Sequence, residues 1–208
     1  MHQELKKNRT YGPNVRLIER NGQAVVEKTY RGKALPVRLL GYVLIFWEGF
    51  IYSKLQGIGG IPELLEGADR FTLFTRFMGG SNLKDSPVAP DARYFDSLES
   101  LIALMHGRGV IHLDLRNRRN YGIDDTGNPY LVDFATCLYI PWNGRMRRLF
   151  EAIDWMGFMK VKKKIRPDLL SEQDKNLSAL GAALSSLWLP TKIVRFIKNF
   201  PKLIRKIF

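Results

Sequence analysis

One stretch of the sequence gathers the side chains that could act on a nucleotide phosphate. His112-Leu-Asp114-Leu-Arg116-Asn-Arg-Arg-Asn120 is followed, after a polar segment, by Leu-Val-Asp133-Phe. The set holds two carboxylates and one carboxamide. Phosphoryl transfer from a Mg²⁺-nucleotide uses such a set, because one carboxylate orients the attacking hydroxyl while the other carboxylate and the amide hold metal on the phosphates. The residue types and their order therefore predict phosphoryl-transfer chemistry.

A short hairpin is expected to bring these side chains together. Residues 120–123 and 130–132 have the composition of short strands, and residues 124–129 between them are dense in turn formers. Such a hairpin places Asn120 and Asp133 at neighbouring strand ends. The alternative is an ordinary loop and hairpin with some surface acids. Single matches of this kind are common by chance, but the full ordered combination is not.

This ordered set resembles the signature of protein kinases, a His-x-Asp-Leu loop that ends in Asn and an Asp-Phe-Gly after a hairpin. Within that superfamily the chain resembles the bacterial lipopolysaccharide-kinase and RIO-like branch. The resemblance follows the order of elements over residues 12–185, and its specific part is residues 110–136. The compact size, the Asp-Leu-Arg loop and the absence of an Ala-Pro-Glu segment after Asp133 favour this branch.

The resemblance implies a fold and a domain organisation. We expect an α+β, bilobal protein-kinase-like fold with a small antiparallel β N-lobe and a mainly helical C-lobe. The N-lobe would comprise residues 1–83 and the C-lobe residues 84–208, with residues 87–90 as the connecting loop.

The resemblance also implies roles for the loop residues. Asp114 would orient or accept the acceptor hydroxyl, and Arg116 would lie near the transferring phosphate as a second catalytic residue. Asn120 and Asp133 would hold Mg²⁺, with Asn117 as the fallback because the loop is one residue longer than usual. The expected cofactors are therefore ATP and Mg²⁺.

An ion pair in the N-lobe is expected to hold the nucleotide. Residues 15–20 and 24–30 flank Asn21-Gly22, the strongest short signal for a hairpin. Lys28 lies late in the second strand, where the family places its phosphate-gripping lysine, although a lone strand lysine is usually a solvated edge residue. A long apolar helix is expected over residues 36–57, and Glu48 is the one charge in its nearly all-apolar run, residues 39–52. We hypothesise that Glu48 pairs with Lys28.

Two features of this region allow other interpretations. The apolar helix could instead span a membrane, but the run is shorter than about 20 residues, and a glutamate within it is costly in lipid. No Gly-x-Gly-x-x-Gly precedes Lys28, so the phosphates must be covered differently or bound weakly.

The loop region also departs from the family signature. Leu113 replaces the usual Arg of the His-Arg-Asp loop, and Ala135 replaces the Gly that usually follows Asp-Phe. His112 is expected to bond backbone rather than to act as a catalyst.

The remaining elements follow from apolar periodicity. Residues 71–77 alternate as a strand, and the glycine-containing segment 78–83 matches the family's adenine-lining hinge. Residues 97–107 form an expected helix, capped by Asp96, with one buried stripe at Leu98, Leu101, Ile102 and Met105. A further helix is expected to open at Ser171.

Composition limits the possible classes. Cys137 is the one cysteine, so disulfide frameworks and thiolate metal clusters are excluded. The first residues contain no apolar run fit for a signal peptide, which favours a cytoplasmic protein. The net charge of +13 is concentrated after residue 137, where 15 Lys and Arg face five Asp and Glu. Such basicity predicts an anionic partner.

Two basic segments suggest what that partner is. Arg118 and Arg119 beside the loop could recruit an anionic acceptor, although a solvated loop is the simpler interpretation. Residues 190–208 alternate between basic and apolar side chains, as in a helix on a membrane surface, with Pro201 as a break. The alternative is a terminal helix packed on the lobe. Peripheral association with the inner face of the membrane is therefore possible; RNA is a weaker candidate, and no DNA partner is expected.

The sequence predicts an ATP- and Mg²⁺-dependent kinase that transfers the γ-phosphate to a hydroxyl, on a membrane-linked glycan or lipid such as lipopolysaccharide core. The alternatives are a RIO-like Ser/Thr protein kinase and a pseudokinase scaffold that binds nucleotide and membrane. The absent glycine loop and Ala135 favour the pseudokinase, whereas Asp114, Asn120 and Asp133 oppose it.

Overall fold

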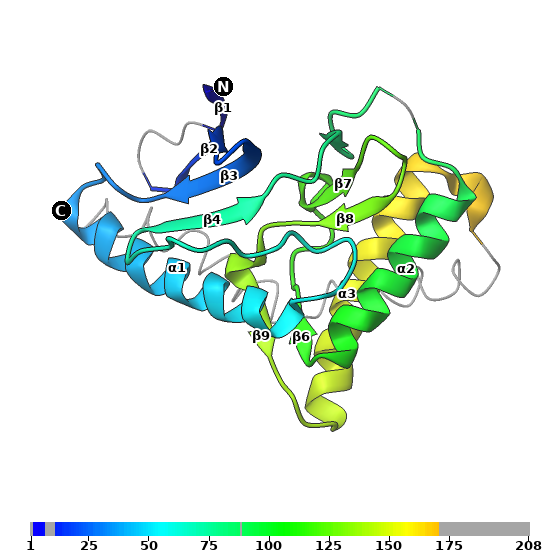
Figure 1. Ribbon diagram of the computed structural model, residues 1–208. Coiled ribbons are helices and arrows are strands. Elements are labelled where there is room, and N and C mark those ends of the chain that lie inside the picture. The colour runs from blue at the N-terminus through cyan, green and yellow to red at the C-terminus, as the bar shows by residue number, and fades with distance from the viewer. Residues whose placement is uncertain (1, 7–10, 88, 171–208) are drawn as a thin grey trace. The chain divides into compact units, whose positions relative to one another are not determined.

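The computed structural model describes residues 2–6, 11–87 and 89–170 of the 208-residue chain (Figure 1). All the elements below lie in residues 1–169, one of the two compact units into which the chain divides. The strands form antiparallel sheets and the helices are mostly segregated from them along the chain, so the predicted α+β class is confirmed. The predicted helix from Ser171 and the predicted basic tail, residues 190–208, lie outside the described residues.

A four-stranded antiparallel sheet forms the N-terminal part, in the order β1-β2-β3-β4. Its strands are β1 (His2–Lys6), β2 (Asn14–Arg20), β3 (Gln23–Thr29) and β4 (Thr72–Arg76). The β2–β3 hairpin turns at Asn21 and Gly22, both with positive φ, as the Asn-Gly signal predicted. The sequence did not indicate β1, because its residues are mostly polar and it becomes a strand by pairing with the edge of β2.

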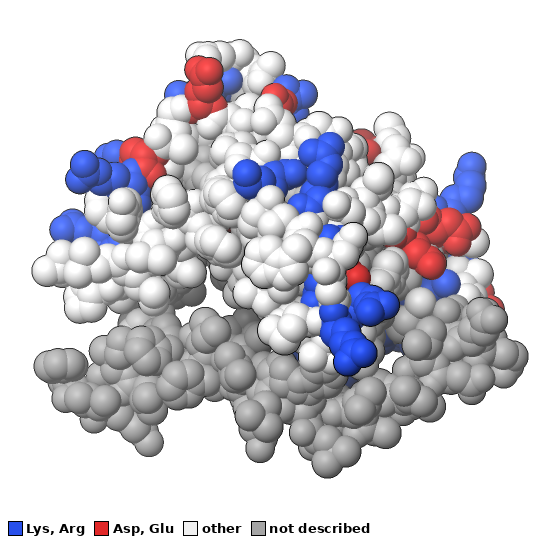
Figure 2. All heavy atoms as spheres, turned by 90° about the horizontal axis from the view of Figure 1, so that it is seen from below, with Lys and Arg blue, Asp and Glu red and all other residues white. Residues whose placement is uncertain are grey.

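Helix α1 (Leu35–Leu55) packs one face against the protein and exposes another. The buried face includes Ile45, Glu48, Ile51 and Leu55, and Pro36 lies in the first turn, where its missing N–H is not needed. By length and composition α1 could cross a membrane, although 28% of its apolar window is buried within the molecule. Figure 2 looks from below and shows a mostly uncharged area at the left, with charged side chains along its edge.

Helix α2 (Ala92–Gly107) delivers the chain to the predicted catalytic loop. The predicted stripe is correct, since Leu98, Leu101, Ile102 and Met105 are all buried. The predicted start is wrong: Asp91, not Asp96, caps the helix by accepting a hydrogen bond from Tyr94 N at 2.9 Å. The buried rings of Tyr94 and Phe95 extend the apolar face by more than a turn.

Small sheets and one long helix complete the described part. Strands β5 (Ser81–Asn82), β7 (Tyr121–Ile123) and β8 (Pro129–Leu131) form one antiparallel sheet, and β6 (Val110–Ile111) pairs with β9 (Leu138–Tyr139). The 3-10 turns are η1 (Arg118–Asn120), η2 (Phe134–Thr136) and η3 (Pro167–Leu169). Helix α3 (Arg145–Ile165) lies beside α2 in Figure 1. Phe95 of α2 meets Phe158 of α3 in the core.

Candidate active site

Lys28 is the meeting point of two acidic side chains from distant parts of the sequence. Its Nζ lies 2.9 Å from Glu48 Oε1 and 2.7 Å from Glu48 Oε2, so the hypothesised ion pair is present. The same Nζ lies 2.9 Å from Asp133 Oδ1. Strand β3 supplies the lysine, α1 the glutamate and the end of the β7–β8 hairpin the aspartate. Three of the six predicted site residues are thus in direct contact.

Burial and charge act against each other in this triad. Burial opposes the charge of Lys28, but attraction to Asp133 and Glu48 outweighs it and raises the pKa of Lys28 well above its ordinary value. Burial raises the pKa of Glu48; the charge of Lys28 opposes this rise and that of Asp133 adds to it. Lys28 therefore keeps its charge at neutral pH, as a group that grips phosphate must.

Two aromatic contacts and one hydrogen bond join α1 to the segment that follows Asp133. Trp47 Nε1 donates to Cys137 O at 3.0 Å, and the rings of Tyr52 and Phe134 lie 5.1 Å apart. Phe134 is fully buried and also contacts the ring of His112 at 5.1 Å. Phe50 of α1 likewise meets the ring of Tyr139. The position of Glu48 is therefore coupled to that of Asp133 through packing as well as charge.

The loop after β6 holds Asp114 and Asn120 together. Asn120 is buried, and its Nδ2 donates to Asp114 O at 3.0 Å and to Asp114 Oδ2 at 3.2 Å. Asn117, the predicted fallback ligand, donates from Nδ2 to Asn120 Oδ1 at 3.2 Å. Asn117 also caps η1. The bond from Asn117 therefore fixes the orientation of the Asn120 amide, and the bond from Asn120 fixes the carboxylate of Asp114.

Backbone geometry links this loop to Asp133. Val132 N donates to Asn120 O at 3.0 Å, which sets Asn120 beside the residue that precedes Asp133. His112 Nε2 lies 3.1 Å from Val132 O, so His112 bonds backbone, as expected from the sequence. Asp133 itself has a left-handed backbone, with φ 69° and ψ 65°. A non-glycine residue in this conformation is uncommon and is typical of functional sites.

Asp154 on α3 anchors the loop, and the sequence interpretation missed it. The carboxylate is completely buried and accepts hydrogen bonds from His112 N and Leu113 N, each at 2.7 Å. It also lies 3.0 Å from His106 Nε2. Leu113 has positive φ, so the backbone is bent at the residue that Asp154 holds. The sequence did contain one indication of this role: Asp154 lies on the same face of α3 as the apolar Phe158, four residues later.

The loop carries three arginines, none of which forms an ion pair with an acidic side chain in the described part of the chain. Arg116 and Arg119 are exposed and Arg118 is half-buried. Arg116 directly follows Leu115, whose backbone oxygen accepts a hydrogen bond from the buried Tyr121 hydroxyl. Tyr121 therefore fixes the loop from inside while the arginines extend outward. This arrangement suits an anionic ligand.

The donor set fits a hard cation that is shared with a substrate. Asp133 exposes 48% of its side chain, and the backbone oxygen of Asn120 accepts a hydrogen bond from Val132 N, the residue before Asp133. Across the described residues no group of three or more His, Cys, Asp or Glu side chains forms a ready metal site. Mg²⁺ usually takes one or two protein ligands and completes its shell with water and phosphate oxygens. Asn120 and Asp133 have the ligand types, an amide and a carboxylate, that such a site uses.

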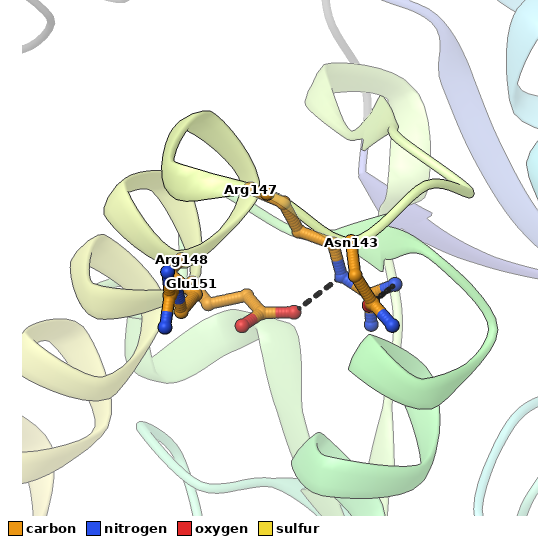
Figure 3. A pocket seen from close by; sticks show the side chains of 5 residues that line it. Asn143, Arg147, Arg148 and Glu151 are labelled. Carbon is orange, nitrogen blue, oxygen red and sulfur yellow. Dashed lines mark hydrogen bonds and ion pairs between the residues drawn. The ribbon is translucent and has the colours of Figure 1, made fainter.

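A surface hollow of about 400 Å³ lies elsewhere, at the start of α3 (Figure 3). It is lined by Asn143, Gly144, Arg147, Arg148 and Glu151. Arg147 fills part of it by bonding Glu151 Oε1 at 2.6 Å and Asn143 Oδ1 at 3.0 Å. None of the predicted site residues contributes to this hollow.

Comparison with solved structures agrees with the predicted kinase-like fold. The Rio2 kinase of Chaetomium thermophilum, as an ADP/Mg²⁺-phosphoaspartate complex, matches with a TM-score of 0.63 at 16% identity over 81% of this chain. Another structure of the same kinase matches with a TM-score of 0.60 at 15% identity over 78%. In both cases the match covers 57% of the longer chain. No protein-family model and no curated sequence matches. The chain therefore has a protein-kinase-like fold.

Proposed function

We propose that this protein is a kinase that transfers the γ-phosphate of ATP to a hydroxyl group. The contact of Lys28 with both Glu48 and Asp133 carries this proposal, because one charged amine is held in place between helix α1 and the end of the β7–β8 hairpin. The similarity to a kinase solved with ADP and Mg²⁺ supports it. Two carboxylates and an amide next to one charged lysine make up the set that phosphoryl transfer requires.

Each residue contributes by positioning or by charge. Lys28 binds the nucleotide phosphates and Glu48 orients Lys28. Asp114, held by Asn120, would orient the acceptor hydroxyl and accept its proton, while the hydroxyl oxygen bonds to the γ-phosphorus and the bond to the ADP oxygen breaks. Bound Mg²⁺, held by Asn120 and Asp133, would neutralise charge on the phosphates. Arg116 lies two residues after Asp114 and would stabilise the transferring group.

The acceptor that we propose is a hydroxyl on an anionic glycan or lipid, as the sequence resemblance to lipopolysaccharide kinases suggested; the solved structures support the kinase-like fold and not this branch. Arg116, Arg118 and Arg119 support an anionic acceptor, since guanidinium groups bind phosphate in bidentate fashion. The competing candidate is a RIO-like Ser/Thr protein kinase, which the similarity to Rio2 kinase favours. A pseudokinase scaffold is the third candidate.

Labelled ATP separates these candidates. The protein is incubated with Mg²⁺, ATP labelled at the γ-phosphate, and lipid, glycan or protein fractions. We expect label in the lipid or glycan fraction, loss of transfer in Asp114→Ala with nucleotide binding retained, and no change in the matched control Asp96→Asn, an exposed acid on α2. Label in the protein fraction would support the RIO-like candidate. Nucleotide binding without turnover would support the scaffold and contradict the kinase.

The arginines give an independent test of the acceptor. Replacing Arg118 and Arg119 together by Gln should raise the KM for the acceptor at least about tenfold, because two phosphate contacts are lost. The KM for ATP should not change. An equal rise in both constants would mean that these arginines serve the nucleotide instead.

A further inference from the structure

The outer face of α1 is an apolar stripe that the described protein leaves uncovered. Leu35, Leu39, Val43 and Phe46 expose 59%, 59%, 57% and 67% of their surface. Their spacing puts them on one side of the helix, opposite the buried Glu48 and Ile51. Contiguous exposed apolar surface on a soluble domain usually marks an interaction site.

A second exposed apolar group lies at the start of α3. Trp142, Met146 and Leu149 expose 66%, 63% and 45% of their surface. Both α1 and the start of α3 lie toward the lower edge of Figure 1, and Figure 2 looks onto that side. Of the ten large apolar side chains that are exposed in the described part, eight belong to these two segments. We call the two together the α1–α3 surface.

Positive charge predominates on this surface, although Glu151, paired with Arg147, lies next to Arg148 at the start of α3. Arg145 and Arg148 are exposed and have no ion-pair partner among the described residues, and basic side chains gather near the start of α3 in Figure 2. Residues 140–150 contain no acid, and the one acid of α1, Glu48, is buried in its pair with Lys28. The start of α3 has no acidic residue in its first turn, so its helix dipole adds to the positive charge.

We propose that the α1–α3 surface binds an anionic lipid surface. Apolar side chains with arginines around them, and a tryptophan among them, are what a peripheral membrane site requires, because the apolar groups enter the interface while the cations meet anionic headgroups. Charge complementarity favours this occupant over a second copy of the chain, since two identical basic surfaces would repel each other.

Helix α1 lies on the membrane in this proposal and does not cross it. Its length and composition would allow crossing, but its inner face supplies Glu48 to Lys28 and Trp47 to Cys137. Crossing would remove these partners and place a carboxylate in hydrocarbon, which is costly. Lying flat keeps the inner face on the protein and buries Leu39, Val43 and Phe46 in the interface.

Vesicle flotation of the full chain tests the proposal without any measurement of phosphate transfer. Wild-type protein should bind vesicles that contain phosphatidylglycerol and should bind pure phosphatidylcholine weakly. Changing Leu39 and Phe46 together to Glu should weaken binding at least about tenfold, because two apolar side chains no longer enter the interface. Changing Arg145 and Arg148 to Glu should weaken it at least about 25-fold, since each basic side chain contributes roughly fivefold.

Matched controls separate this surface from general effects of charge and folding. Leu104→Glu alters an apolar side chain on α2 with 58% exposure, and Lys84→Glu reverses an exposed charge after β5. Both controls should bind as wild type does. Circular dichroism should show that every variant is folded, because all the changed residues are exposed.

Several outcomes would overturn the proposal. If the α1 and α3 variants float as wild type does, another segment binds the membrane. If wild type does not bind the anionic vesicles, the surface is covered by the protein's own chain or by a partner. If wild type elutes as a dimer and the Leu39 and Phe46 variant as a monomer, a second copy is the occupant. None of these readouts depends on the proposed kinase activity, so either proposal can fail alone.

Discussion

Lys28 holds two carboxylates with one ammonium group, so its replacement affects both stability and nucleotide binding. In Lys28→Met, Glu48 stays buried without its partner, and the free energy of unfolding should fall by about 3 kcal/mol. Because the pKa of Lys28 is raised above its ordinary value of 10.5, its contribution is fully present below that pH and is lost only as the pH rises through the folded-state pKa.

Urea denaturation at about pH 7 and about pH 9 checks this expectation. The difference between wild type and Lys28→Met should be at least as large at the higher pH. Lys84→Met, which changes an exposed lysine, should differ from wild type by less than about 0.5 kcal/mol. A difference that shrinks toward pH 9 would mean that Lys28 loses its proton early and that the ion pair is weaker than its geometry indicates.

Asp154 determines the shape of the loop that carries Asp114. In Asp154→Ala, the N–H groups of His112 and Leu113 lose a buried charged acceptor, and the free energy of unfolding should fall by about 3 kcal/mol. The positive φ of Leu113 would also lose its restraint, so kcat should fall with it. Denaturation and initial-rate measurements check both. Asp96→Ala is the control, and an equal loss there would contradict the role of Asp154.

Single residues differ in how far the sequence could predict their contacts. Asp114 and Asn120 lie in one loop, and the β7–β8 hairpin returns the chain from Asn120 to Asp133, so their order in the chain predicts much of their proximity. Lys28 and Glu48 lie far from that hairpin, and the family resemblance, rather than spacing, predicted their pairing. Asp154 approaches the loop from a separate helix. No local pattern specifies such a long-range contact, which depends on how α3 packs.

At the scale of elements, α3 packs closely against the loop that carries Asp114. A Cβ added at Gly157 would lie 2.9 Å from Arg116 N and from Leu115 C, both backbone atoms. Gly157→Ala should therefore push the loop away from α3, cost about 1–3 kcal/mol of stability and lower kcat more than it raises the KM for ATP.

Gly107→Ala is the matched control for that change. Gly107 lies near the end of α2, and a Cβ there meets nothing within 4 Å. Alanine favours helix by up to about 1 kcal/mol over glycine, so the control should be neutral or more stable. Thermal denaturation and steady-state kinetics compare the two variants. Equal kinetics for Gly157→Ala and wild type would show that the loop accommodates the added methyl group.

Elements with strong local signals were predicted well. The Asn-Gly hairpin, the long apolar helix and the strand over residues 72–76 are present with boundaries within a few residues of those predicted. The start of α2 was misplaced because Asp96 and Asp91 are both reasonable caps, and burial of Tyr94 and Phe95 decides between them. Strand β1 depends on its partner strand and has little signal of its own.

For the molecule as a whole, binding of a nucleotide should raise the free energy of unfolding. At a concentration about 100 times its Kd, Mg²⁺-ADP should raise the free energy of unfolding by about 2.7 kcal/mol. ADP with EDTA should give a smaller increase, because the carboxylate of Asp133 then faces phosphate charge without a metal between them. Lys28→Met should lose most of the increase. Equal stabilisation with and without Mg²⁺ would contradict metal binding by Asn120 and Asp133.

The hydrogen bond from Trp47 to Cys137 O makes Trp47 an intrinsic fluorescence probe of the position of α1. An indole whose N–H bonds a backbone carbonyl emits differently from one in water, so any outward swing of α1 would change its fluorescence. The chain has four tryptophans, and the indole of Trp47 alone is tied by such a bond to the segment after Asp133 in the described part. Replacing the others by Phe would yield a single-tryptophan protein whose emission follows that swing in real time.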